Sequence, residues 1–160
     1  MIVADTSPLN YLILIDVIEV LPELFRDVAI PPAVEQELLA KGSSEKVRKW
    51  IENSPDWLRV TAVRKIVEEI KLGKGEVEAI SLAVELSADL ILLDDKAARF
   101  SATAANLNVI GTLGILKFAD ENKLIDFETA IKKLQMTNFR ASRRLLEDLI
   151  KQQRQEKFSN

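Results

Sequence analysis

The sequence contains no histidine and no cysteine among its 160 residues. Without histidine there is no imidazole to act as a general base, as a member of a Ser-His-Asp triad or as a metal ligand. Without cysteine there is no thiolate nucleophile, no disulfide and no zinc site of the usual cysteine-containing kind. Any catalysis must therefore use carboxylates, hydroxyls, lysines, arginines and a hard metal ion, and 25 aspartates and glutamates supply the first of these.

Long hydrophobic runs are also scarce. The apolar stretch over residues 9–15 is interrupted by Asn10, closed by Asp16 and not preceded by a basic region. It is too short for a membrane span and does not have the form of a signal peptide. Because disulfides are absent as well, we expect a cytoplasmic protein with no membrane partner. A length of 160 residues, 48% of them hydrophobic, is sufficient for one domain with a substantial core.

The net charge of −3 is unevenly distributed along the chain. Residues 1–130 hold 14 basic and 22 acidic side chains, whereas residues 131–160 hold 8 basic and 3 acidic ones. The acidic body argues against non-specific adhesion to nucleic acid over the whole surface. The basic C-terminal segment is suited to a local contact with RNA or a partner, although a solvated helix face explains it equally well.

Short apolar runs alternate with segments of helical periodicity. This alternation predicts a three-layer α/β/α sandwich around a central, mostly parallel sheet of four or five strands. Arg59 interrupts one of the apolar runs, which places that strand nearer an edge of the sheet. The predicted strands cover residues 2–5, 28–30, 57–60, 90–93 and 109–110, and the predicted helices cover residues 9–20, 32–39, 44–51, 66–72, 76–86, 96–105, 112–121, 127–134 and 142–153, with a turn at 73–75 and frayed residues from 155.

Two of the predicted strands end on aspartate, Asp5 and Asp94. Because the carboxyl ends of parallel strands line the ligand crevice in open α/β folds, we expect both carboxylates to face one cleft. Two further acids, Glu37 and Glu76, lie near predicted helix starts, where the helix dipole also favours a carboxylate as a simple cap. Four carboxylates in one cleft repel one another unless a cation holds them, and ligation by oxygen alone selects Mg²⁺ or Mn²⁺.

Five short motifs accompany these acids along the chain. The motifs are DTSPL from residue 5, Glu37-Leu38, GKGEVEAI from residue 73, LLDD from residue 92 and VIGTLGIL from residue 109. Each motif is weak alone, but their order and spacing together are fairly specific. In this order and spacing the chain resembles the PIN-domain family over residues 1–125.

The resemblance implies a metal-dependent nuclease domain over residues 1–125, with C-terminal helices over 126–160 packing on it or extending from it. It implies that Asp5, Glu76 and Asp94 bind the metal and that Glu37 is a further catalytic acid. Many PIN nucleases have aspartate where this chain has Glu76, whose carboxylate reaches one methylene further. Ser7, Asp95 and Thr112 are candidates for contacts with a metal-bound water or with the substrate. The alternative acids are Asp95 at the fourth acidic position, Glu35 in place of Glu37 and Glu78 in place of Glu76.

The function that the resemblance implies is a Mg²⁺- or Mn²⁺-dependent endoribonuclease. Many PIN domains are toxins of VapBC-like toxin–antitoxin pairs, so the expected partners are RNA and a small antitoxin protein. Helices rich in leucine and isoleucine near residues 9–25 and 142–150 favour a homodimer as well. The alternative is a catalytically inactive PIN-like module that binds nucleic acid or protein. A haloacid-dehalogenase-type phosphatase is disfavoured because Ser7 stands where that chemistry needs a second aspartate.

Overall fold

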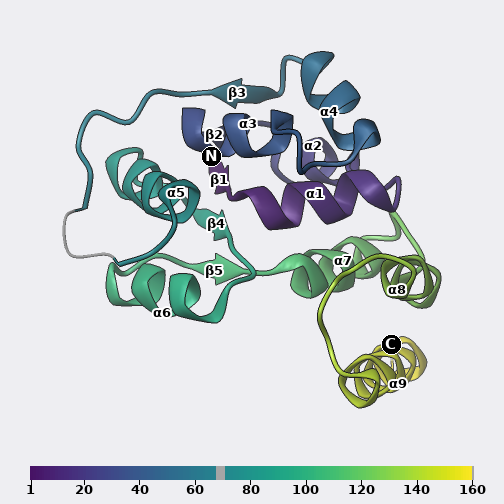
Figure 1. Ribbon diagram of the computed structural model, residues 1–160. Coiled ribbons are helices and arrows are strands. Elements are labelled where there is room, and N and C mark those ends of the chain that lie inside the picture. The colour runs from purple at the N-terminus through teal and green to yellow at the C-terminus, as the bar shows by residue number, and fades with distance from the viewer. Residues whose placement is uncertain (68–70, 160) are drawn as a thin grey trace. The chain divides into compact units, whose positions relative to one another are not determined.

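A single parallel sheet organises the N-terminal part of the chain. The computed structural model describes residues 1–67 and 71–159 (Figure 1). The sheet order is β3-β2-β1-β4-β5, with every adjacent pair parallel, which confirms the predicted α/β class. The strands in the described residues are β1 (Ile2–Ala4), β2 (Val28–Ile30), β3 (Leu58–Val60), β4 (Leu90–Leu92) and β5 (Val109–Ile110).

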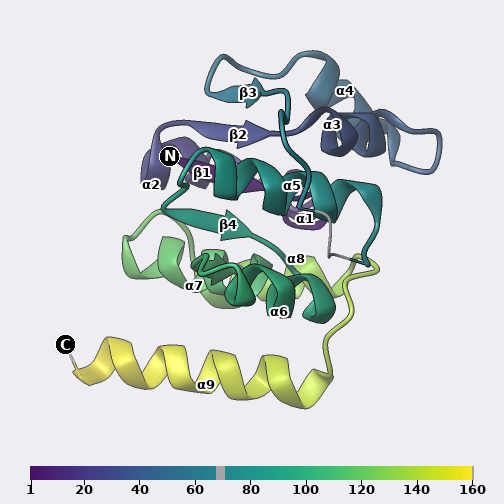
Figure 2. The same ribbon diagram turned by 90° about the vertical axis from the view of Figure 1, so that its left-hand side faces the viewer.

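Helices cover both faces of this sheet. Figures 1 and 2 show α1 on one face and α5 and α6 on the other, so the predicted three layers are present. α3 packs against both α1 and α5, beyond the end of β2. The helices in the described residues are α1 (Thr6–Leu14), α2 (Val20–Phe25), α3 (Pro32–Leu39), α4 (Glu45–Glu52), α5 (Lys74–Glu85), α6 (Lys96–Ala104), α7 (Thr112–Glu121), α8 (Phe127–Gln135) and α9 (Arg143–Ser159).

The apolar strand sequences explain the centre of the sheet. All three residues of β1 and all three of β2 are buried, because helices cover both faces of these strands. β1 pairs with β4, with Ile2 opposite Leu90 and Ala4 opposite Leu92. By contrast, Arg59 is exposed on β3, which confirms the predicted edge position of that strand. The two strands that precede aspartates are therefore neighbours at the middle of the sheet.

Several predicted element bounds were wrong. The predicted helix over 9–20 is two helices, because Asp16 adopts a left-handed backbone (φ 61°) that an α-helix cannot continue through. α5 begins at Lys74 with Gly73 as its N-cap, so the predicted turn at 73–75 is shorter. α9 continues to Ser159, well past the predicted end at 153 and through the residues expected to fray.

The helix predicted over residues 66–72 has no support from the described residues in that range. Residues 66, 67, 71 and 72 are not helical, and residues 68–70 lie outside the described residues.

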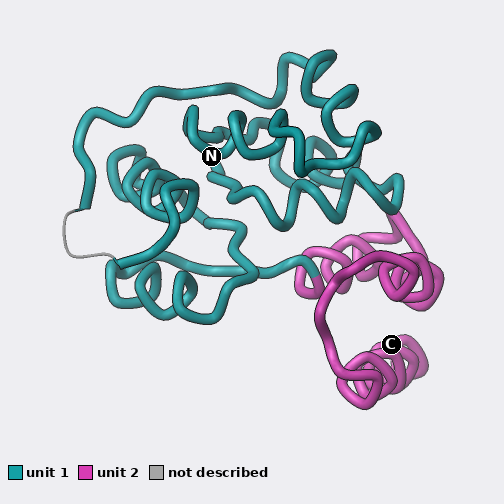
Figure 3. The backbone as a smooth tube through the Cα atoms, viewed as in Figure 1, with its two compact units in different colours: residues 1–112 teal, residues 113–160 magenta. Residues whose placement is uncertain are grey.

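The chain divides into two compact units, coloured separately in Figure 3. Unit 1, Met1–Thr112, contains the whole sheet and all the predicted site residues. Unit 2, Leu113–Asn160, contains α8, α9 and all but the first residue of α7. None of the helices in the described residues is long and apolar enough to cross a membrane. The predicted domain boundary between residues 125 and 126 stays a prediction.

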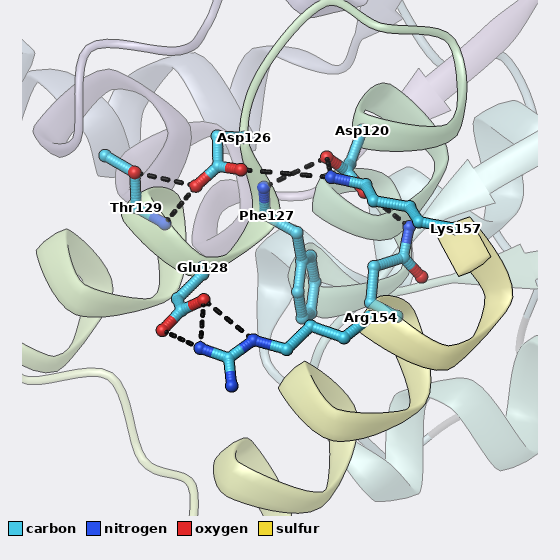
Figure 4. Close-up of polar contacts among 8 residues, drawn as sticks. Asp120, Asp126, Phe127, Glu128, Thr129, Arg154 and Lys157 are labelled. Carbon is cyan, nitrogen blue, oxygen red and sulfur yellow. Dashed lines mark hydrogen bonds and ion pairs between the residues drawn. The ribbon is translucent and has the colours of Figure 1, made fainter.

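A buried carboxylate joins the helices of unit 2 (Figure 4). Asp120, only 4% exposed, accepts hydrogen bonds from the Phe127 N–H at 3.2 Å and from Gln153 Nε2 at 2.6 Å. Lys157 Nζ lies 2.7 Å from the same carboxylate, and Arg154 forms a forked contact with Glu128 at 2.6 Å. Lys157 and Arg154 of the basic segment therefore connect α9 to α7 and α8, which makes these two cations less available for RNA.

Replacing Asp120 with alanine tests this attachment. The substitution leaves the Gln153 amide and the Phe127 N–H without their acceptor, so we expect the free energy of unfolding to fall by about 2 kcal/mol. Urea denaturation measures the change, with Asp148→Ala on the exposed face of α9 as the matched control. Equal stability of the two variants would show that the Asp120 contacts do not hold α9.

Candidate functional site

Asp5 lies at the end of the central strand β1. Its backbone N–H donates to the Leu92 carbonyl of β4 at 3.0 Å, which fixes it within the sheet. Although Asp5 occupies the N-cap position of α1, its side chain makes no capping hydrogen bond. The side chain is 4% exposed, and Oδ1 is buried without a hydrogen-bond partner among the described residues. A simple capping role therefore does not account for this carboxylate.

The charges that act on the Asp5 carboxyl come from the other three predicted acids. The pKa of the Asp5 carboxyl is raised from 3.8 to about 7, mainly by burial, with smaller contributions from the negative charges of Glu76, Glu37 and Asp94. A backbone hydrogen bond from Thr6 opposes the rise. The three other predicted acids are therefore close enough to Asp5 for their charges to disfavour its ionised form.

Asp94 follows β4 and is held by hydroxyl and backbone donors. Thr112 donates its N–H to Oδ1 and its hydroxyl to Oδ2, both at 2.7 Å. Ser7 donates its hydroxyl to Oδ2 at 3.0 Å. A Cβ on Gly111 would lie 2.9 Å from Oδ1, so the glycine leaves space that the carboxylate needs. The structure therefore places both predicted neighbours, Ser7 and Thr112, directly on Asp94.

Glu37 lies on α3 and reaches the first turn of α5. Its Oε1 accepts the Gly75 N–H at 3.2 Å, and its Oε2 accepts the Thr6 hydroxyl. A Cβ on Gly75 would lie 2.5 Å from the nearer carboxylate oxygen, so only glycine leaves room for this contact. Glu37 therefore links the start of α5 to the first residue of α1.

Glu76 lies in the first turn of α5, beside the residue that Glu37 contacts. Partial burial raises its pKa, and the charges of Asp95 and Glu37 raise it further. Backbone hydrogen bonds at residues 76 and 73 oppose this rise. Glu76 and Asp5 are thus the acids in this site whose pKa values rise because burial and neighbouring carboxylates disfavour their charged forms.

Two of the alternative acids accept hydrogen bonds from backbone N–H groups at helix starts. Asp95 caps α6 by accepting the Ala98 N–H at 2.9 Å, although its charge acts on Glu76. Glu78 accepts the Ala33 N–H at 2.9 Å at the start of α3. Glu35 lies in the first turn of that helix. The electrostatic neighbours of Asp5 therefore include Glu37 and Glu76 rather than these alternatives.

The sequence reasoning missed Thr6 and Gly75 as parts of the site. Neither residue is among the predicted site residues, but both donate hydrogen bonds to the Glu37 carboxylate. The available signals were a hydroxyl residue directly beside Asp5 and a glycine directly before Glu76. Neither signal indicates which side chain the residue contacts, because Glu37 is far from both residues in the sequence.

The donor set fits a hard divalent cation in its chemistry. Every candidate ligand is a carboxylate or hydroxyl oxygen, and Asp5 has one oxygen that no described residue satisfies. Over residues 1–67 and 71–159, however, no three acids form a group that could hold a metal ion as they stand. Side-chain movement must therefore accompany binding of a metal by three of these acids.

Comparison with known proteins identifies the family of this chain. The chain matches the DUF3368 family model, described as PIN domain, over residues 1–155, and it belongs to that family. The match extends beyond the predicted residue 125 into α9. PIN domains are generally nucleases.

Two other comparisons add little to this assignment. A solved PilT N-terminus domain protein from the hyperthermophilic archaeon Sulfolobus solfataricus P2 is 15% identical, with a TM-score of 0.48. The alignment covers 89% of this chain and all of that one. No curated protein matches the chain significantly.

The raised pKa of Asp5 predicts a specific dependence of stability on pH. The folded protein holds this proton up to about pH 7, whereas the unfolded chain releases it near its ordinary pKa of 3.8. The resulting stabilisation is complete below the unfolded pKa and is lost as pH rises through the folded one. Between pH 5 and pH 8, Asp5 should lower the free energy of unfolding by on the order of 2.5 kcal/mol.

Chemical denaturation of the metal-free protein at both pH values measures this change. Asp5→Asn should be markedly less sensitive to pH, whereas Asp56→Asn at an exposed position should behave like the parent protein. A parent protein and Asp5→Asn variant with the same pH profile would contradict the buried titration of Asp5.

Replacing Gly75 with alanine should separate stability from metal binding. The new methyl group meets the end of the flexible Glu37 side chain, and alanine favours the helix by about 1 kcal/mol, so stability should not fall. The displaced Glu37 carboxylate should nevertheless weaken Mn²⁺ binding about tenfold by calorimetry. Gly42→Ala is the control, because nothing lies within 4 Å of a Cβ there. Unchanged Mn²⁺ affinity in Gly75→Ala would contradict the placement of Glu37.

Proposed function

We propose that this protein is a Mg²⁺- or Mn²⁺-dependent endoribonuclease. Membership of the PIN-domain family supports nuclease activity in general. The observation that carries the proposal is the buried Asp5 carboxylate, which has an unsatisfied oxygen and lies among the charges of three other acids. Such an arrangement is costly for folding alone, because burial and repulsion both disfavour the ionised group.

The contacts of each acid indicate its role in the proposed reaction. Asp5, Asp94 and Glu76 would hold the ion, which when bound supplies Lewis-acid activation of water and neutralises charge on a phosphodiester. Ser7 and Thr112 fix the orientation of Asp94, with one hydrogen bond to Oδ1 and two to Oδ2. Glu76 is less buried than Asp5 and reaches one methylene further than aspartate, so its carboxylate can move toward the ion.

The partners follow from the same proposal. RNA is the substrate, and a small antitoxin protein that covers the acidic site is the partner expected of a VapBC-like toxin. A homodimer is the proposed assembly. Its support is narrower than the sequence suggested, because Leu9, Leu12 and Leu21 of the apolar N-terminal segment are fully buried in the core. Leu145 on α9, in contrast, remains 45% exposed.

A second candidate is a PIN-like module that binds nucleic acid or protein without cutting. Two observations favour it: the described residues contain no group of three acids placed to hold a metal, and glutamate replaces aspartate at position 76. Calorimetric titration separates the candidates, because a nuclease must bind Mn²⁺ through its acids, and a module without activity need not.

The direct test is cleavage of single-stranded RNA by the purified protein in the presence of Mn²⁺. We expect Asp5→Asn to lower the cleavage rate at least 100-fold, since it removes the central carboxylate while keeping its size. Asp56→Asn, purified in the same way, should retain the parent activity. Equal cleavage by the parent protein and Asp5→Asn would indicate a contaminating nuclease and reject the proposal.

A further inference from the structure

Two adjacent hydroxyl residues after Asp5 hold two different acids. Thr6 donates its hydroxyl to Glu37 Oε2, and Ser7 donates its hydroxyl to Asp94 Oδ2 at 3.0 Å. Glu37 comes from α3 and Asp94 follows β4, so the two acids belong to elements far apart in the sequence. The first turn of α1 therefore contacts both of these acids next to the buried Asp5 carboxylate.

The two held acids have matching environments. Each accepts a second hydrogen bond from a backbone N–H in the first turn of another helix, Gly75 for Glu37 and Thr112 for Asp94. Each also fills the space where a glycine lacks its Cβ, at Gly75 and at Gly111. Both carboxylates are thus fixed between a hydroxyl of α1 and the start of a different helix.

We propose that Thr6 and Ser7 are positioning residues that set the places of Glu37 and Asp94 beside Asp5. The expected effect on metal binding rests on the proposed function, whereas the positioning of the two acids does not. Without the Thr6 hydroxyl, Glu37 keeps only the 3.2 Å contact with Gly75 among the contacts described above. Without the Ser7 hydroxyl, Asp94 still has both 2.7 Å contacts with Thr112. Loss of the Thr6 hydroxyl therefore has the larger effect.

The arrangement can be tested in the metal-free, full-length protein by NMR. The Gly75 amide reports on Glu37, and the Thr112 amide reports on Asp94, because each donates to that carboxylate. Thr6→Val should shift the Gly75 amide resonance more than that of Thr112, and Ser7→Ala should do the reverse. Thr103→Val is the control, since its hydroxyl bonds within α6.

The consequence is measured by titrating the same samples with Mg²⁺. We expect affinity to fall about tenfold in Thr6→Val, because the released Glu37 would no longer hold its negative charge beside Asp5. We expect a fall of about threefold in Ser7→Ala, because Thr112 still holds Asp94. The conservative variants Thr6→Ser and Ser7→Thr keep a hydroxyl and should bind within twofold of the parent protein. This rescue distinguishes positioning of the acids from a general loss of structure, which melting temperatures of all variants monitor.

The outcomes separate this proposal from the proposed function. If the parent protein binds Mg²⁺ and neither Thr6→Val nor Ser7→Ala changes its affinity, the positioning proposal is rejected and the nuclease proposal stands. If the parent protein binds no Mg²⁺, metal dependence fails, and the amide shifts alone decide the positioning proposal. Selective shifts of the paired amides then support it, and absent or unselective shifts overturn it.

Discussion

The burial of one carboxylate between two central strands is the constraint on which the site depends. Asp5 is at the end of β1, its N–H is bonded to β4, and its Oδ1 has no partner among the described residues. Burial raises its pKa to about 7, and the nearby charges of Glu76, Glu37 and Asp94 add to the rise. The folded protein therefore has a group that gains from a proton or a cation and is penalised when ionised without one.

Hydrogen bonds from the surrounding structure fix two of the acids near Asp5. Glu37 and Asp94 each accept hydrogen bonds from a hydroxyl of α1 and from a backbone N–H of another helix. These contacts fix the positions of both carboxylates. Burial and the charges of neighbouring acids raise the pKa values of Asp5 and Glu76, so a bound cation would relieve the cost of ionising these two groups.

Much of the fold and the set of acids could be predicted from the sequence. The apolar runs before Asp5 and Asp94 identified two central strands, and the parallel α/β pattern placed their ends together. Local sequence did not predict that Asp16 would separate α1 from α2, because the apolar pattern continues across it. The contact of Glu37 with Gly75 was equally hidden, since it depends on how α3 packs against α5. Periodicity describes one element at a time, whereas these features arise between elements.

Crystals equilibrated with Mn²⁺ above pH 8, where Asp5 is ionised, test the central claim most directly. Anomalous scattering locates the manganese ion without assumptions about its ligands. The account predicts one strong peak at the carboxyl edge of the sheet, in ligand contact with Asp5 Oδ1 and with Asp94 or Glu76. A map with no peak in this cleft at saturating Mn²⁺, or with a peak that does not touch Asp5, would contradict it.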